Sequence, residues 1–85
     1  MQEKVLVFDT ETTGFRSDDE VLTLAVVNGV GETMVDGMYA PVRKAEWPDA
    51  ERINRISPAM VAGCDPILAH REELERLFNA PDTLL

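Results

Sequence analysis

Several residue types that define other classes of protein are scarce in this chain of 85 residues. Its one cysteine, Cys64, cannot form an intramolecular disulfide or a thiolate metal cluster, and a buried structural role is the simplest interpretation. No apolar run approaches the roughly 20 residues of a membrane span. The first apolar run, residues 5–8, ends at an acid and does not have the pattern of a signal peptide. These absences favour a soluble, cytoplasmic protein without a membrane partner.

Basic residues are also few, since 8 Lys and Arg stand against 16 Asp and Glu and give a net charge of -8. Proteins that hold nucleic acid by its phosphates normally present a basic surface. This chain has no such surface, so any action on nucleic acid would need a divalent cation to supply positive charge at the point of contact. The hydrophobic content of 45% still suits one small folded domain.

The patterns that are present predict an α/β protein. Three β-rich runs with an Asn28-Gly29 hairpin signal predict a three-stranded meander. Its first strand lacks alternation and is expected to be covered on both faces. Pro48, and then Ser57 with Pro58, predict two short helices, before a longer amphipathic helix and the start of a further strand. The expected elements are 4–9, 20–27, 32–40, 48–55, 58–62, 67–79 and 82–85.

The most informative stretch is Val-Phe-Asp-Thr-Glu-Thr-Thr-Gly-Phe, residues 7–15. Side chains two apart on a strand share a face, so Asp9 and Glu11 are expected to converge on one spot at the strand's end. Two carboxylates held together repel each other unless a cation lies between them, and oxygen ligands suit Mg²⁺ or Mn²⁺. On spacing alone, most such pairs are solvated loop acids. The surrounding string is what favours a metal site here.

That string closely resembles the first motif of the DnaQ-like (DEDD) 3′→5′ exonucleases, a family that includes the proofreading subunit of bacterial DNA polymerase III and exodeoxyribonuclease X. The similarity continues through the hairpin and Pro41 to residues 50–61, which are similar to the family's Ile-His-Gly-Ile-Thr region. The resemblance implies a ribonuclease H-like exonuclease fold. It is incomplete here, with residues 1–85 forming the N-terminal portion of one domain.

The resemblance also implies roles for individual residues. Asp9 and Glu11 would be the catalytic metal ligands in a two-metal hydrolysis at the 3′ end of a single-stranded nucleic acid. The residues that would contact the terminal nucleotide are Thr12, Thr13, Gly14, Phe15 and Ile56. For Phe15 and Ile56, which would pack against the base, plain core packing is an equal alternative.

Other positions depart from the family pattern. Asn54 stands where relatives often carry His, and the second and third motifs, which include the general base, are not in the chain. His70 is expected to face solvent in the middle of the long helix, so it does not replace that base. We therefore expect the chain alone to be nearly inactive, because two carboxylates cannot complete the coordination of two cations.

A different class of function fits the same residues. The chain could be a non-catalytic remnant that serves as a protein-interaction or dimerisation module through an unpaired sheet edge. Its partner would then be the missing C-terminal half, a second copy of the chain or a polymerase. A third interpretation, an acidic decoy that mimics nucleic acid, rests on the net charge alone.

Overall fold

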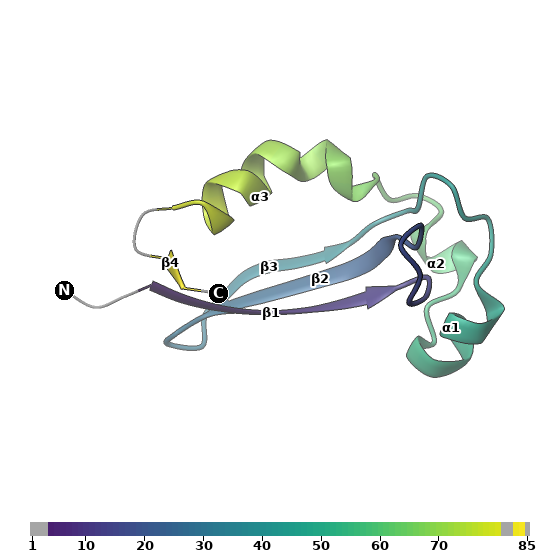
Figure 1. Ribbon diagram of the computed structural model, residues 1–85, viewed down its shortest axis with the longest axis horizontal. Helices are drawn as coiled ribbons and strands as arrows, with labels where there is room; N and C mark the ends of the chain where they lie inside the picture. The colour runs from purple at the N-terminus through teal and green to yellow at the C-terminus, as the bar shows by residue number, and fades with distance from the viewer. Residues whose placement is uncertain (1–3, 81–82, 85) are drawn as a thin grey trace.

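A computed structural model describes residues 4–80 and 83–84 of the chain. Strands β1, β2 and β3 form an antiparallel meander, and β4 lies parallel beside the start of β1, which gives the sheet order β3-β2-β1-β4. Helix α3 runs along one face of the sheet, whereas α1 and α2 lie beyond the end at which β1 finishes (Figure 1). The elements are β1 (Lys4–Thr12), β2 (Val21–Asn28), β3 (Thr33–Met38), α1 (Pro48–Asn54), α2 (Pro58–Val61), the 3-10 helix η1 (Ile67–His70), α3 (Arg71–Phe78) and β4 (Thr83–Leu84). The expected α/β order with a three-stranded meander is confirmed.

Strand β1 is longer than its sequence predicts. It continues past the expected end at Asp9 to Thr12, and its register against β2 stays regular up to a bulge between Glu11 and Thr12. Threonine is well suited to a pleated sheet, and pairing with β2 supplies the rest of the stabilisation. The two acidic residues of the motif therefore lie inside a paired strand and not in a loop.

Only one face of β1 is covered. Leu6 is buried on the α3 face, and Phe8 on the same face meets Phe78 edge-on, with ring centroids 5.9 Å apart. On the other face Val5 and Val7 remain 39% and 59% exposed. We expected β1 to be covered on both faces, and for the described residues this is wrong. The strand lacks alternation because its open face also carries apolar side chains, not because a second layer covers it.

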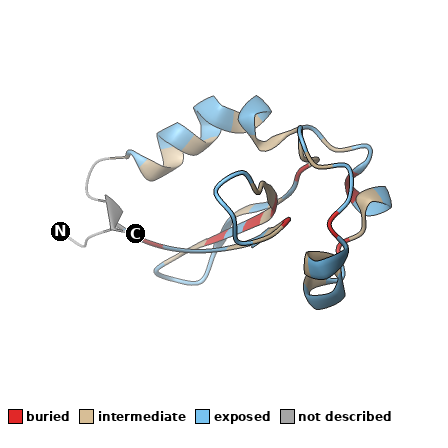
Figure 2. Ribbon diagram, turned by 45° about the vertical axis from the view of Figure 1, so that its right-hand side comes forward, coloured by how far each residue is buried: buried red, intermediate tan, exposed pale blue. Residues whose placement is uncertain are grey.

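The buried side chains form two clusters. One lies between the sheet and α3, and the other joins the start of β2 to the α1–α2 region. In Figure 2 the buried residues are the red segments of the ribbon. Trp47 belongs to the second cluster and donates a hydrogen bond from Nε1 to the Ile56 carbonyl at 2.7 Å. The first cluster is Leu6, Leu24, Val26 and Tyr39, against which Ile67, Leu74, Leu77 and Phe78 pack; the second is Leu22, Trp47, Ile56 and Val61.

The helix signals in the sequence are confirmed at their starts. Pro48 occupies the first turn of α1, and the Ser57 side chain accepts a hydrogen bond from the Met60 N–H at the start of α2. Helix α1 ends at Arg55 with φ 61°, a left-handed conformation that turns the chain back toward the core.

The segment expected to be one helix over residues 67–79 is divided into η1 and α3. At their junction the His70 ring packs edge-on against Tyr39, with centroids 5.5 Å apart. The prediction that His70 faces solvent is therefore wrong. His70 is the last residue of the 3-10 helix, and its side chain faces Tyr39, which directly follows β3.

The expected further strand is present at Thr83–Leu84, which pair with Lys4 and Val5. Residues 82 and 85 of that expected strand lie outside the described residues. None of the helices in the described chain has both the length and the apolar character that a bilayer span requires.

Replacing the buried indole tests the second cluster. Trp47→Phe removes the donor to the Ile56 carbonyl and leaves that acceptor without its partner, so we expect the free energy of unfolding to fall by about 1–3 kcal/mol. Urea unfolding followed by circular dichroism measures this. Tryptophan fluorescence is not suitable, because the variant lacks the chain's one tryptophan. The control Phe15→Leu, at a fully exposed position, should change stability by less than about 0.5 kcal/mol. Equal stability of the two variants would contradict the hydrogen bond.

Candidate functional site

The two candidate metal ligands project from the open face of β1. Asp9 lies opposite Ala25 and Glu11 opposite Thr23 in the ladder, so both side chains share the face away from α3. Their Cα atoms are about 7 Å apart, the repeat of two residues along a strand. Both side chains are exposed. The sequence-based prediction that they point to the same side is thus met.

Neither carboxylate has a polar partner among the described residues. Within the described residues, Asp9 and Glu11 side chains accept no hydrogen bond and form no ion pair, in contrast to the acids of the neighbouring turn. Asp36 on β3 lies on the same face as Asp9, because both residues are paired with Ala25 of β2. Two strand spacings, about 10 Å, separate Asp36 from Asp9.

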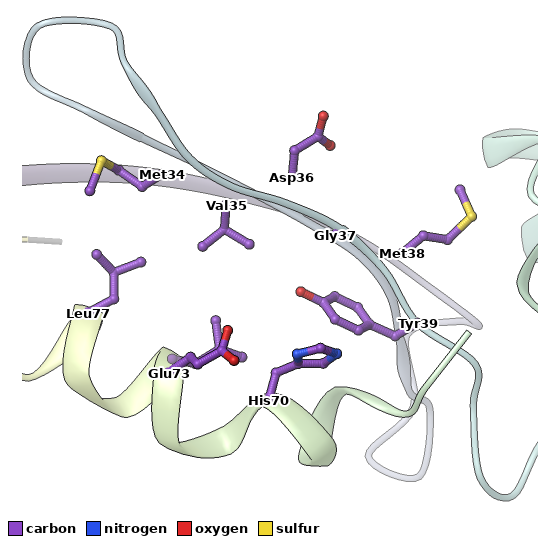
Figure 3. A pocket seen from close by; sticks show the side chains of 10 residues that line it. Met34, Val35, Asp36, Gly37, Met38, Tyr39, His70, Glu73 and Leu77 are labelled. Atoms are coloured by element: carbon purple, nitrogen blue, oxygen red, sulfur yellow. The ribbon is translucent and has the colours of Figure 1, made fainter. Parts of the chain in front are cut away.

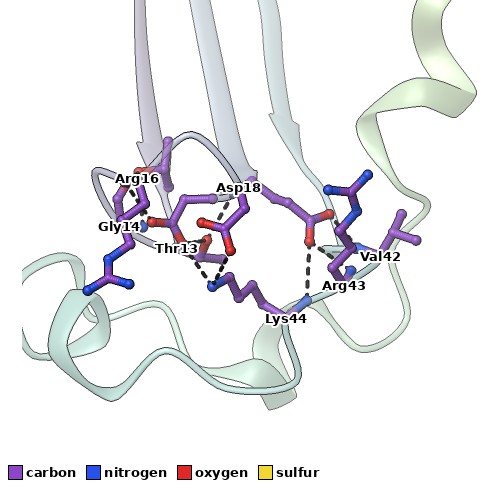
Figure 4. A network of polar contacts seen from close by, with 10 residues as sticks. Thr13, Gly14, Arg16, Asp18, Val42, Arg43 and Lys44 are labelled. Carbon is purple, nitrogen blue, oxygen red and sulfur yellow. Dashed lines mark hydrogen bonds and ion pairs between the residues drawn. The ribbon is translucent and has the colours of Figure 1, made fainter.

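The turn after β1 is fixed by a buried threonine (Figure 4). Thr13 is 6% exposed, and its hydroxyl donates to Asp19 Oδ1 at 2.7 Å while accepting from the Glu20 N–H at 2.9 Å. Its backbone N–H donates to the Glu20 carbonyl at 2.9 Å. A Cβ at Gly14 would collide with the Asp19 carboxylate, so only glycine allows this close approach.

Asp19 is the centre of this turn. The Thr13 hydroxyl and the Arg16 N–H, the latter at 2.9 Å, hold the pKa of its carboxyl below the usual value, with a further contribution from Lys44. The Lys44 ammonium lies 3.6 Å from Asp19 and 3.3 Å from Asp18. The turn is therefore tied by charge to the segment that leads to α1.

Glu20 anchors the same segment through its backbone. Burial of the Glu20 carboxyl acts to raise its pKa, but hydrogen bonds from the Val42, Arg43 and Lys44 N–H groups outweigh burial and lower the pKa. These bonds measure 2.5, 2.7 and 3.2 Å. These roles of Asp19 and Glu20 were not predicted from the sequence; the run of acids just before β2 is the signal that could have indicated them.

Asn54 connects α1 directly to the motif. Its Nδ2 donates to the Thr12 carbonyl at 3.1 Å, and its Oδ1 accepts from the Ile56 N–H at 2.9 Å. Thr12 immediately follows Glu11, at the bulge. Asn54 thus supports the end of the strand that carries the candidate metal ligands.

The remaining candidate residues separate into different environments. Phe15 is 100% exposed and lines a groove of about 450 Å³ between the turn and α1. Ile56 is only 6% exposed and packs in the core beside Trp47, so its side chain offers no surface to a ligand in this conformation. The Thr12 hydroxyl donates to the Gly14 carbonyl at 2.7 Å and therefore serves the turn itself.

The donor set fits part of a hard-cation site. Asp9 and Glu11 supply carboxylate oxygens on an open surface, which are ligands that Mg²⁺ and Mn²⁺ accept. No group of three or more His, Cys, Asp and Glu side chains suited to a metal ion occurs in the described part of the chain. Any ion held by this pair would need further ligands from water, substrate or another polypeptide segment.

Comparison with solved structures identifies the fold. The chain superimposes on exonuclease I from Methylocaldum szegediense with a TM-score of 0.80 at 23% sequence identity. It superimposes on Escherichia coli exonuclease I, solved in complex with a dT13 oligonucleotide, with a TM-score of 0.74 at 22% identity. Each match covers 96% of this chain and 19% of the exonuclease chain.

The chain therefore has the fold of an N-terminal fragment of the ribonuclease H-like exonuclease I structure, and it spans about a fifth of those chains' length. Sequence comparison finds neither a family model nor a curated relative that matches.

The Glu20 anchor gives a pH-dependent prediction. Since the folded-state pKa of Glu20 lies below the unfolded value of 4.5, its carboxylate stabilises the fold above pH 4.5, and this contribution is lost as pH falls through the folded-state pKa. We expect Glu20→Gln to lower the free energy of unfolding at pH 7 and to flatten its decline toward acid pH. Urea midpoints measured from pH 3 to pH 7 test this. The exposed Glu46→Gln is the control, and parallel curves for wild type and Glu20→Gln would contradict the anchor.

The Asn54 link is tested by hydrogen exchange. In Asn54→Ala the Thr12 carbonyl loses its side-chain donor, so we expect the amides of residues 12–14 to exchange faster while the rest of the sheet keeps its protection. Exchange followed by ¹H–¹⁵N NMR measures this. Asn79→Ala, at an exposed position after α3, is the matched control. Unchanged protection at residues 12–14 would show that the bond does not hold the strand end.

Proposed function

We propose that this chain is the N-terminal portion of a single 3′→5′ exonuclease domain of the DnaQ-like kind, acting on the 3′ end of single-stranded nucleic acid. The observation that carries the proposal is the pair Asp9 and Glu11, on the open face of β1 with no partner in the described residues. The fold shared with exonuclease I supports it, as does the oligonucleotide bound to one of those enzymes.

In this proposal Asp9 and Glu11 hold Mg²⁺ or Mn²⁺. A bound divalent cation supplies the positive charge that activates water and stabilises the leaving oxygen of a phosphodiester. The pair is suited to this role because its negative charge is not compensated by any described side chain. An acidic chain also gains the most from a cation at the place where a phosphate must approach.

The groove beside the turn receives the terminal nucleotide. Phe15 presents a fully exposed ring on which a base can stack, and the nearby Ile53 side chain is 77% exposed. Thr12, Thr13 and Gly14 act by shaping the turn, since their hydroxyl and N–H groups are bonded within it. Ile56 supports the groove from the core.

The described residues include no general base for this reaction at the pair. His70, the chain's one histidine, packs on Tyr39 at the α3 face, whereas Asp9 and Glu11 project from the opposite face of the sheet. We therefore expect the chain alone not to degrade single-stranded DNA. Robust Mg²⁺-dependent degradation that Asp9→Ala abolishes would disprove this inactivity.

Metal binding tests the proposal directly. Substoichiometric Mn²⁺ should broaden the ¹H–¹⁵N signals of residues 8–13, and Asp9→Ala should weaken this effect by about tenfold or more. Asp36→Ala removes a carboxylate from the same row and face, so it is a matched control that should bind Mn²⁺ like the wild type. Equal effects of the two substitutions would indicate general attraction to an acidic surface and refute the site.

Nucleotide binding tests the second half of the proposal. An oligothymidylate with a free 3′-hydroxyl should shift the amide signals of residues 13–16 in the presence of Mg²⁺, and Phe15→Ala should weaken this by about 1–3 kcal/mol, the value of one stacked base. The same oligonucleotide with a 3′-phosphate should bind less well. Binding that is indifferent to Mg²⁺, to the 3′ end and to Phe15 would oppose the proposal.

A further inference from the structure

Strand β3 forms one edge of the sheet in the described chain. The Tyr39 N–H donates to the Leu22 carbonyl, so alternation along the antiparallel ladder directs the backbone groups of Gly37 toward β2 and those of Asp36 and Met38 outward. Asp36 and Met38 are exposed. The outer edge of β3 thus presents N–H and C=O groups that another strand can pair with.

A groove of about 410 Å³ with both polar and apolar lining lies beside this edge, between β3 and the η1–α3 segment, and its apolar residues include Val35, Leu74 and Leu77. Figure 3 shows Val35 and Tyr39 pointing from the strand toward the helix, where they meet Leu77 and His70. The Tyr39 ring crosses Gly37 so closely that a Cβ there would collide with the phenol, which makes glycine necessary to the groove's floor.

The two sides of this edge differ in character. On the α3 side, a residue of an added strand would meet the apolar floor, with the Glu73 carboxylate directed toward it from α3 (Figure 3). On the open side, Asp36 points away from the helix and would lie next to a residue of the added strand. No Lys or Arg is among the described residues that line the groove.

We infer that the outer edge of β3, with its groove, binds an extended segment of a partner protein that adds to the sheet as a further strand and alternates apolar with basic residues. The apolar residues enter the groove on the α3 side, and the basic residues lie on the open side beside Asp36. Main-chain pairing supplies the affinity, and the alternating environment sets the specificity. This surface is separate from the proposed exonuclease site and does not depend on it.

Charge argues against a second copy of the chain as the occupant. Pairing β3 with β3 would bring two Asp36 and two Glu73 side chains toward one another on molecules that each carry a net charge of -8. Like charges opposed across strands are destabilising, whereas Lys or Arg at the same places is favourable.

A synthetic peptide of alternating valine and lysine tests the inference with the intact chain. Titrated into the ¹⁵N-labelled protein, it should shift the amide signals of residues 34–39 and slow the exchange of the Asp36 and Met38 amides. The same peptide N-methylated at every backbone nitrogen keeps its charge but has no N–H to donate to the edge, so it should not bind. Binding of the methylated peptide at equal strength would overturn the inference.

Two exposed acids provide a matched pair of variants. Asp36 lies on the edge strand, whereas Glu72, in the first turn of α3, lies outside the groove. Asp36→Lys should weaken peptide binding about fivefold, because it places a positive charge beside the peptide's lysines, and Glu72→Lys should leave it unchanged. Equal weakening would reveal a response to net charge alone. Peptide-induced shifts confined to residues outside both β3 and the η1–α3 segment, or self-association of the free chain through β3, would also overturn the assignment.

Discussion

The alternation of side chains along β1, with a helix on only one side of the sheet, is the constraint on which the rest of the structure depends. Leu6 and Phe8 pack toward α3, and the same geometry turns Asp9 and Glu11 to the opposite face. A shift of register by one residue would bury both acids beneath the helix and expose the apolar side chains. Core packing and placement of the carboxylates are therefore a single requirement.

The acids of this chain serve two physical purposes. Asp19 and Glu20 are satisfied by hydroxyl and N–H donors, and they join the first turn to the segment before α1. Asp9 and Glu11 accept no hydrogen bond from any of the described residues. The structural hydrogen bonds of the turn therefore lie beside these two carboxylates and do not involve them.

Signals that act over a few residues were readable from the sequence. Pro48 and Ser57 mark helix starts because capping is a property of one turn, and both predictions are confirmed. Features decided by distant segments were not readable. The extension of β1 through Glu11 depends on its ladder with β2, and the orientation of His70 depends on Tyr39 and a 3-10 turn. The Asp-x-Glu spacing located the acidic pair, but no local signal indicated that its face would be open.

The hydrogen bond from Asn54 to the Thr12 carbonyl joins positions 42 apart in the sequence. It fixes the last residue of α1 to the peptide group that follows Thr12, one residue beyond Glu11. A substitution that displaces Asn54 therefore removes a support from the end of the strand that carries the two carboxylates. Loss of metal or nucleotide binding in such a variant would not by itself identify a residue that touches a ligand.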